Sequence, residues 1–178
     1  SMYATSNSYM LDNGISSTEQ IKFILTHPFQ YLKVLIYTTI ANFEFYFFTV
    51  FGRNLGNYTI QLASIIPVIY AFILAFSPFL EKHKIELKKE TKISIIIIFT
   101  LIYCLIETGL YLVWTKIGAN IIEGVQGRYF IPIVFLIPML FIDKKNELHF
   151  KNRRFWISLC LLFINFLAVY RIFKYFNY

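Results

Sequence analysis

Long apolar runs separated by short connectors constrain this chain more than any other feature of its sequence. A helix needs about 20 consecutive apolar residues to cross the hydrocarbon core of a bilayer. The clearest runs are residues 60–79, 93–114, 129–142 and 156–170. Hydrophobic residues make up 57% of the chain and charged residues 15%, a balance that is unusual for a soluble domain. The sequence therefore predicts an integral membrane protein.

A fifth run, residues 29–51, has two interpretations. It is long enough to span, but Lys33, Tyr37 and Glu44 share one stripe at helical spacing. The segment could cross the membrane with this stripe facing other helices, or lie in the interface as an amphipathic helix. We therefore predict an all-α fold, a polytopic membrane helix bundle with five transmembrane helices, or with four plus one interfacial helix.

The first 28 residues differ from the rest of the chain. They are mostly polar, and the stretch from Ser17 to Gln20 is suited to the start of a short amphipathic helix. His27-Pro28 ends that helix, because the residue before a proline disfavours the α conformation. The predicted organisation is a polar N-terminal segment, residues 1–28, followed by a transmembrane helical domain, residues 29–178.

Two connectors, residues 81–92 and 143–154, hold most of the cations. Their basic residues are Lys82, Lys84, Lys88, Lys89, Lys92, Lys144, Lys145, Lys151, Arg153 and Arg154. The other loops contain only Arg53, Lys116 and Arg128. The positive-inside rule therefore predicts that both connectors are cytoplasmic and that residues 52–59, 116–128 and the C-terminus face outward. The N-terminus is then inside with five spans and outside with four.

The formal net charge of +7 therefore reflects topology, and we expect no nucleic-acid partner, because the cations do not line one polar face. Cys104 and Cys160 lie inside apolar runs and belong to no CxxC pattern. We expect no disulfide, no metal site and no cofactor, since the sequence contains no phosphate-binding loop, dinucleotide fingerprint or HExxH pattern.

The stretch IEGVQGRYF, residues 122–130, is a polar island between two apolar runs. A helix over residues 129–142 would be about 21 Å long at roughly 1.5 Å per residue, against a core of about 30 Å. It is too short to span alone. We therefore predict that residues 124–128 sit below the outer surface, at the depth of Glu107 and Glu44.

Two hypotheses explain this polar island. In the first, Arg128, Gln126, Glu123, Glu107 and Glu44 form a substrate-binding pocket that opens outward, in which the Arg128 guanidinium and the backbone N–H groups beside the glycines bind an anion. The phosphate of a lipid carrier is one natural occupant. In the second, Arg128 pairs with Glu123 or Glu107 and joins two spans, or extends toward the interface. No catalytic residue can be assigned.

Two stretches resemble a known family. IIEGVQGRYFIPIVFLIPML is similar to the C-terminal signature of a bacterial multi-spanning membrane family called domain of unknown function 2142, and STEQIKFILTHPFQYLKVLIYTTI resembles an earlier segment of the same family. The likeness runs from about residue 17 to residue 140. It implies a multi-pass protein of the bacterial inner membrane.

The resemblance also implies a function. Members of that family resemble glycosyltransferases of the GT-C type, which take sugars from polyprenyl-phosphate donors on the outer face. The chain would then be the C-terminal module of such a cell-envelope enzyme, with a pocket for a polyprenyl-phosphate-linked sugar, and it would be inactive alone because the catalytic outer loop lies upstream. Its partners would be the lipid bilayer and the upstream part of a longer protein or a second membrane subunit.

The turn FGRNLGNY departs from the family pattern, because Asn57 and Tyr58 replace a Trp-Asp pair, so no role of that Asp carries over. The alternative is a non-enzymatic membrane protein that scaffolds partners, or that binds or transports a lipid-linked glycan.

Overall fold

The computed structural model describes residues 14–55, 59–80, 86–143 and 152–177. Its N-terminal part contains helices α2 (Ser17–Thr26), α3 (Pro28–Ala41) and α4 (Phe43–Val50). Helix α2 begins where expected, since the side chain of Ser16 accepts a hydrogen bond from the Glu19 N–H at 3.4 Å. It ends at His27, and Pro28 begins α3, where its missing N–H costs nothing.

The rest of the described chain consists of a short β-hairpin and further helices. These elements are β1 (Asn54–Leu55), β2 (Ile60–Gln61), α5 (Ile65–Phe76), η1 (Ser77–Phe79), α6 (Lys89–Val113), η2 (Gly127–Phe130), α7 (Ile131–Val134), α8 (Leu136–Met139) and α9 (Arg153–Phe176). The two strands are antiparallel, and Asn54 is paired with Gln61. The sequence predicted a simple turn at residues 52–59, and the paired strands lie at its edges.

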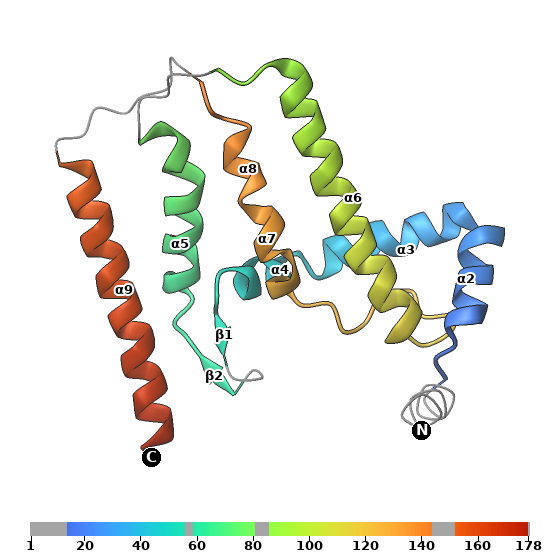
Figure 1. Cartoon of the computed structure of the whole chain (residues 1–178). Coiled ribbons are helices and arrows are strands. Elements are labelled where there is room, and N and C mark those ends of the chain that lie inside the picture. Colours follow the sequence, from blue (N-terminus) through green and yellow to red (C-terminus); the bar gives the residue numbers. More distant parts are fainter. Residues whose placement is uncertain (1–13, 56–58, 81–85, 144–151, 178) are drawn as a thin grey trace, which may run out of the picture.

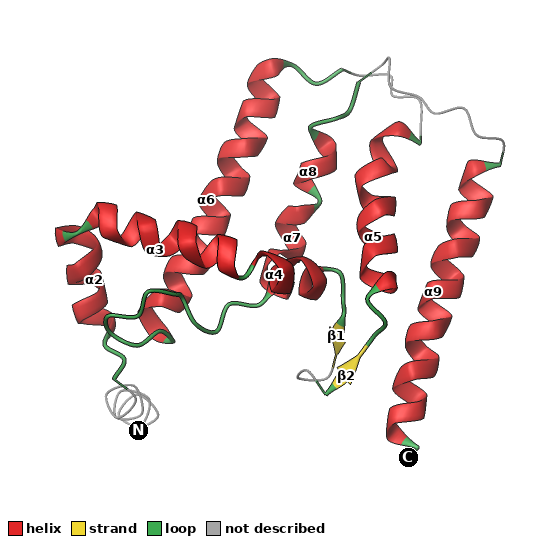
Figure 2. Ribbon diagram, turned by 180° about the vertical axis from the view of Figure 1, so that it is seen from behind, coloured by secondary structure: helices red, strands yellow, loops and turns green. Residues whose placement is uncertain are grey.

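Helices α9, α5, α8–α7 and α6 form a row, whereas α3 lies across α6 (Figure 1). The row is held by contacts between α5 and α8 and between α6 and α7. Ile66 of α5 packs with Ile164 of α9, and the Tyr70 hydroxyl donates to Asn165 Oδ1 at 3.2 Å. The view from behind shows the same transverse course of α3 (Figure 2).

The ends of the row agree with the predicted grouping of the loops. The C-terminal ends of α5 and α8 and the N-terminal ends of α6 and α9 lie together at the top of Figure 1, so the two basic connectors join helices at the same end. The hairpin and the C-terminal end of α9 lie at the opposite end. Residues 81–85 and 144–151 themselves lie outside the described residues.

Helices α6 and α9 are the two described helices that are long and apolar enough to cross a membrane. Their apolar side chains are not buried as in the core of a soluble protein, since Leu105 is 70% exposed and Leu162 is 69% exposed. The segments Ile65–Phe79 and Gly127–Met139 are apolar but shorter. The prediction of a helical membrane protein is therefore met, and the finer prediction of five spans is not confirmed.

The predicted span 29–51 is divided into α3, of 14 residues, and α4, of 8 residues. The break occurs at Asn42, whose N–H is bonded to both Thr38 O and Ile40 O in a tight turn. The start of the described chain lies at the C-terminal end of α6, the end predicted to face outward, because the Ile117 N–H donates to Gly14 O at 3.0 Å. This arrangement favours the alternative of four spans plus one interfacial segment.

Labelling with a membrane-impermeant thiol reagent distinguishes these two topologies. In a Cys104→Ser and Cys160→Ser background, we expect cysteines at Glu19 and Asn120 to be labelled from outside and a cysteine at Lys88 to be protected. The reason is that Gly14 and Ile117 are adjacent, so α2 and the loop after α6 share one side. Protection at Glu19 would support five spans, and labelling at Lys88 would overturn the orientation.

Candidate functional site

The loop between α6 and η2, residues 114–126, is held in place by threonine hydroxyl groups. We call this loop the strap. Thr38 Oγ1 of α3 accepts a hydrogen bond from the Ile122 N–H at 2.9 Å, and Thr115 Oγ1 accepts one from the Glu123 N–H at 3.0 Å. Because a buried N–H without a partner is costly, these bonds fix the course of the strap beneath α3.

A threonine hydroxyl group also holds the first residue of η2. Thr49 Oγ1 of α4 accepts a hydrogen bond from the Gly127 N–H at 2.9 Å. At the other end of the strap, the Gln20 amide of α2 donates to the Thr115 carbonyl oxygen, and Gln20 is only 1% exposed. The polar island is therefore bonded to α3 and α4, and the start of the strap is bonded to α2.

The two glycines of the polar island have packing roles. Gly124 has φ +79°, and a Cβ at this position would collide with the Trp114 indole ring. A Cβ on Gly127 would collide with the backbone of α4 at Tyr46 and Val50. The hypothesis that these glycines expose N–H groups to an anion is corrected for Gly127, because its N–H is already bonded to Thr49.

Glu107 of α6 is fully buried, with 0% exposure. The hydroxyl groups of Tyr46 and Tyr103 interact with its carboxyl group, although neither Oε atom has a hydrogen-bond partner of standard geometry among the described residues. Tyr103 is fixed in turn by a bond of 2.7 Å between its hydroxyl and Thr39 Oγ1. Burying a carboxyl group of a membrane-spanning helix without a cationic partner costs free energy. This cost makes Glu107 a candidate functional residue.

An aromatic cavity of about 360 Å³ lies between α3–α4, α6 and α7–α8. Its walls include Phe43, Tyr46, Phe99, Tyr103, Phe130 and Val134. The Tyr103 and Phe130 rings are stacked with centroids 5.0 Å apart, and Tyr46 meets Phe130 edge to face at 5.4 Å. Tyr46 and Tyr103 thus contact the cavity and also approach the buried Glu107 carboxyl group. The cavity suits an apolar ligand.

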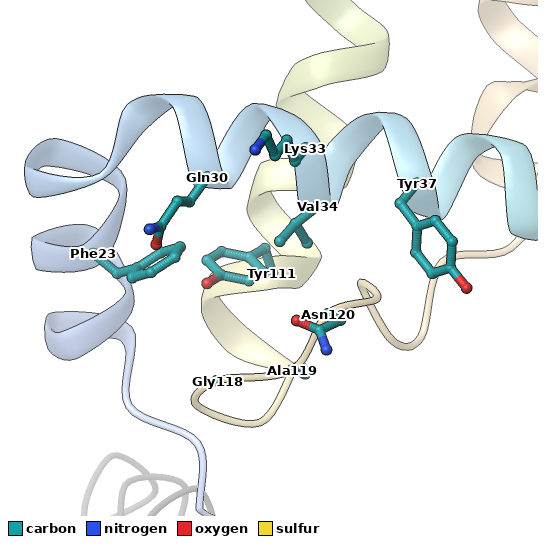
Figure 3. Close-up of a pocket in the computed structure, with 9 residues that line it drawn as sticks. All are labelled: Phe23, Gln30, Lys33, Val34, Tyr37, Tyr111, Gly118, Ala119 and Asn120. Carbon is teal, nitrogen blue, oxygen red and sulfur yellow. The ribbon is translucent and has the colours of Figure 1, made fainter.

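Two polar cavities follow one another along the strap. The first, which we call the amide cavity, has a volume of about 450 Å³ and is lined by Gly118–Asn120 and by residues of α2, α3 and α6 (Figure 3). The second, also about 450 Å³, is lined by residues 121–126 together with Asn42 and Phe45. Both are formed by α3–α4 on one side and the strap on the other.

The structure brings two of the five predicted site residues together. Glu123 and Gln126 line the second polar cavity, and Gln126 Oε1 is buried without a hydrogen-bond partner among the described residues. Glu107 is buried behind Tyr46 and Tyr103, and Glu44 is exposed on α4. Arg128 is exposed at the start of η2, and its depth in the membrane stays a prediction.

Among the described residues, Arg128 does not join two helices through an ion pair. Within the described part of the chain it pairs with neither Glu123 nor Glu107, and its guanidinium lies 5.9 Å from the Tyr129 ring centroid. The Glu107 carboxyl group is also without a cationic partner in that part of the chain. The guanidinium is therefore available to an external anion.

Sequence reasoning missed the residues that hold the strap, namely Gln20, Thr38, Thr49 and Thr115. Three of them are buried almost completely, at 1%, 0% and 0% exposure for Gln20, Thr38 and Thr115. The sequence did contain one signal for them, namely that Thr38 and Thr49 lie within an apolar run, because polar side chains within membrane helices usually face other protein segments. As for metals, the described residues contain no group of three or more His, Cys, Asp or Glu side chains suited to binding an ion.

A row of helices that includes two long apolar ones with largely exposed side chains is typical of an α-helical membrane protein. The profile of the family described as "Predicted membrane protein (DUF2142)" matches residues 1–137, and the chain belongs to this family. Searches of curated proteins and of solved structures found no match. The family resemblance inferred from the GVQGRYF stretch is confirmed at this level, whereas the GT-C likeness is not shown.

Proposed function

We propose that the chain is the C-terminal membrane module of a GT-C-like cell-envelope glycosyltransferase and that it holds a polyprenyl-phosphate-linked sugar at its outer end. The family description supports the membrane location. The sugar-transfer part of the proposal rests on the resemblance of the GVQGRYF stretch. The module is proposed to require an upstream part or a second subunit for activity.

The observation that carries the proposal is the position of the aromatic cavity beside the turn that bears Arg128. Phe130 and Val134 line the cavity, and Arg128 precedes Phe130 by two residues in the same 3₁₀ turn. An isoprenoid chain is apolar and unsaturated, and it suits a wall of stacked and edge-on rings. Its phosphate would then be near the exposed guanidinium of Arg128, which offers a fork of donors that matches phosphate oxygens.

The second polar cavity, lined by residues 121–126, supplies groups that can bind the sugar. Gln126 Oε1 is a buried acceptor that has no hydrogen-bond partner among the residues that the structure describes, and Glu123 lines the same cavity. Both can accept hydrogen bonds from sugar hydroxyl groups. Glu107 and Glu44 lie on the α6 and α4 helices that border the aromatic cavity; we retain both as candidates that contact the ligand after the upstream part is in place.

Substitution of Arg128 tests the phosphate contact. In nanodiscs of neutral lipid, we expect Arg128→Ala to weaken the binding of a polyprenyl phosphate by about tenfold or more, because a charge-assisted hydrogen bond is lost. Arg128→Lys keeps the charge but loses the bidentate geometry, and it should recover only part of the affinity. Binding of the matching polyprenol should be unchanged in both variants. An unchanged affinity for the polyprenyl phosphate in both Arg128 variants would contradict the proposal.

A further inference from the structure

The amide cavity, between α2, α3 and the first part of the strap, is lined by both aromatic and polar side chains (Figure 3). Phe23 of α2 and Tyr111 of α6 provide the aromatic walls, and Gln30 of α3 and Asn120 of the strap provide amide groups. We propose that this cavity is a binding site for an anionic saccharide, that is, a sugar ring that carries one phosphate or carboxylate group.

The aromatic walls are fixed in position by the surrounding packing. Tyr111 is only 2% exposed, and its ring is tilted against Tyr31 with centroids 5.1 Å apart. The Phe23 ring is supported because it stacks on the His27 ring, with centroids 5.4 Å apart. A wall that is already rigid costs little entropy on binding. Tyr111 closes the cavity from behind, and the partly exposed Phe23 ring is the surface that suits the C–H face of a pyranose, which is apolar although its edges carry hydroxyl groups.

The amide groups supply the complementary polar chemistry. Each amide side chain has one acceptor oxygen and two donor hydrogens, so it can bond to neighbouring hydroxyl groups that both donate and accept. Gln30 and Asn120 come from opposite sides of the cavity, from α3 and from the turn after Gly118. The turn is fixed by Gly118 with φ +78° and by the bond between the Ala119 N–H and Lys116 O at 3.2 Å. Asn120 therefore lies on the strap side of the cavity, below α3 in Figure 3.

The charge of the cavity selects an anion. Lys33 is the one charged residue among those that line it, and no ion pair of Lys33 is formed within the described segments. An ammonium group at the rim can pair with a phosphate or carboxylate on the ligand. The volume of about 450 Å³ lies within the roughly 300–1,000 Å³ typical of small-molecule sites. The residues differ from those of the proposed lipid site, so this inference does not depend on it.

A titration with three soluble probes tests the inference on the full chain in phosphatidylcholine nanodiscs, where no sugar detergent competes. The probes are glucose 1-phosphate, glucose and inorganic phosphate. Binding of the two sugars is measured by saturation-transfer NMR, and binding of inorganic phosphate, which has no C–H protons, is measured by its competition with glucose 1-phosphate. We expect glucose 1-phosphate to bind about tenfold or more tightly than either of the other probes, because only this probe uses the amides, the rings and the cation together.

Matched lysine variants separate a built site from general attraction to a basic surface. Lys33→Met should remove the advantage of glucose 1-phosphate over glucose, whereas Lys116→Met, at an exposed strap lysine that does not line the cavity, should leave it intact. Asn120→Ala should weaken glucose and glucose 1-phosphate equally. The inference is overturned if phosphate alone binds as tightly as glucose 1-phosphate, if Lys116→Met has the same effect as Lys33→Met, or if no probe binds saturably. Loss of polyprenyl phosphate binding in the Arg128 variants would leave these results unchanged.

Discussion

Replacing Gly127 by alanine is expected to destabilise the protein strongly, because the added Cβ has no space. It would collide with the Tyr46 carbonyl oxygen, with Thr49 Oγ1 and with the Val50 backbone nitrogen. Two of these three atoms belong to the backbone of α4 and cannot turn aside as a flexible side chain would. Overpacking of this kind costs about 2–3 kcal/mol, and the shift would also strain the bond from the Gly127 N–H to Thr49.

The measurement is the thermal unfolding of the purified protein, and Gly109→Ala is the matched control. Gly109 lies within α6, and a Cβ there meets nothing within 4 Å. We expect Gly127→Ala to lower the melting temperature by roughly 5–10 °C for a chain of this size. Gly109→Ala should leave it unchanged or raise it slightly, since alanine favours a helix by about 1 kcal/mol over glycine. Equal melting temperatures for the two variants would contradict the packing described for η2 and α4.

Much of the helix layout could be predicted from the sequence. Pro28 marked the end of α2, and the apolar runs marked α6 and α9, which begin at Lys89 and Arg153. These features follow from local rules about chain length, hydropathy and proline, so a single sequence is enough to find them. Residues 129–142 were predicted to be one helix, and the structure divides them among η2, α7 and α8; that this segment begins below the surface stays a prediction.

The break at Asn42 could not be predicted in the same way. Residues 29–51 form one apolar run by composition, and only the structure shows that Thr38 and Thr49 bond to the strap and to η2. These bonds join residues that are 84 and 78 positions apart. A hydrogen bond between distant segments leaves no periodic signal, so the transverse course of α3 stayed one of two alternatives.

The candidate site was predicted in part. The sequence identified the polar island, and the structure places Glu123 and Gln126 beside one cavity. The sequence did not predict that Glu107 would face Tyr46 and Tyr103 or that Arg128 would be exposed. Depth along a helix can be estimated from residue counts, but the direction of each side chain depends on how the helices pack.

Filling the aromatic cavity is expected to abolish most lipid binding. Val134 lines the cavity of about 360 Å³ beside Phe130, and Val134→Trp places an indole ring in that space. The fold should persist because the ring enters an existing cavity. Val169→Trp is the matched control, since Val169 is 62% exposed on α9. Ile137→Trp provides a second variant of the same cavity if Val134→Trp lowers the melting temperature.

The affinity of these variants for a fluorescent polyprenyl phosphate in neutral nanodiscs tests the central claim most directly. The proposed function predicts that Val134→Trp weakens binding by about tenfold or more, equivalent to roughly 1.4 kcal/mol, whereas Val169→Trp binds like the unmodified protein. Equal affinity of Val134→Trp, Ile137→Trp and Val169→Trp would contradict the proposal that the aromatic cavity holds the lipid chain.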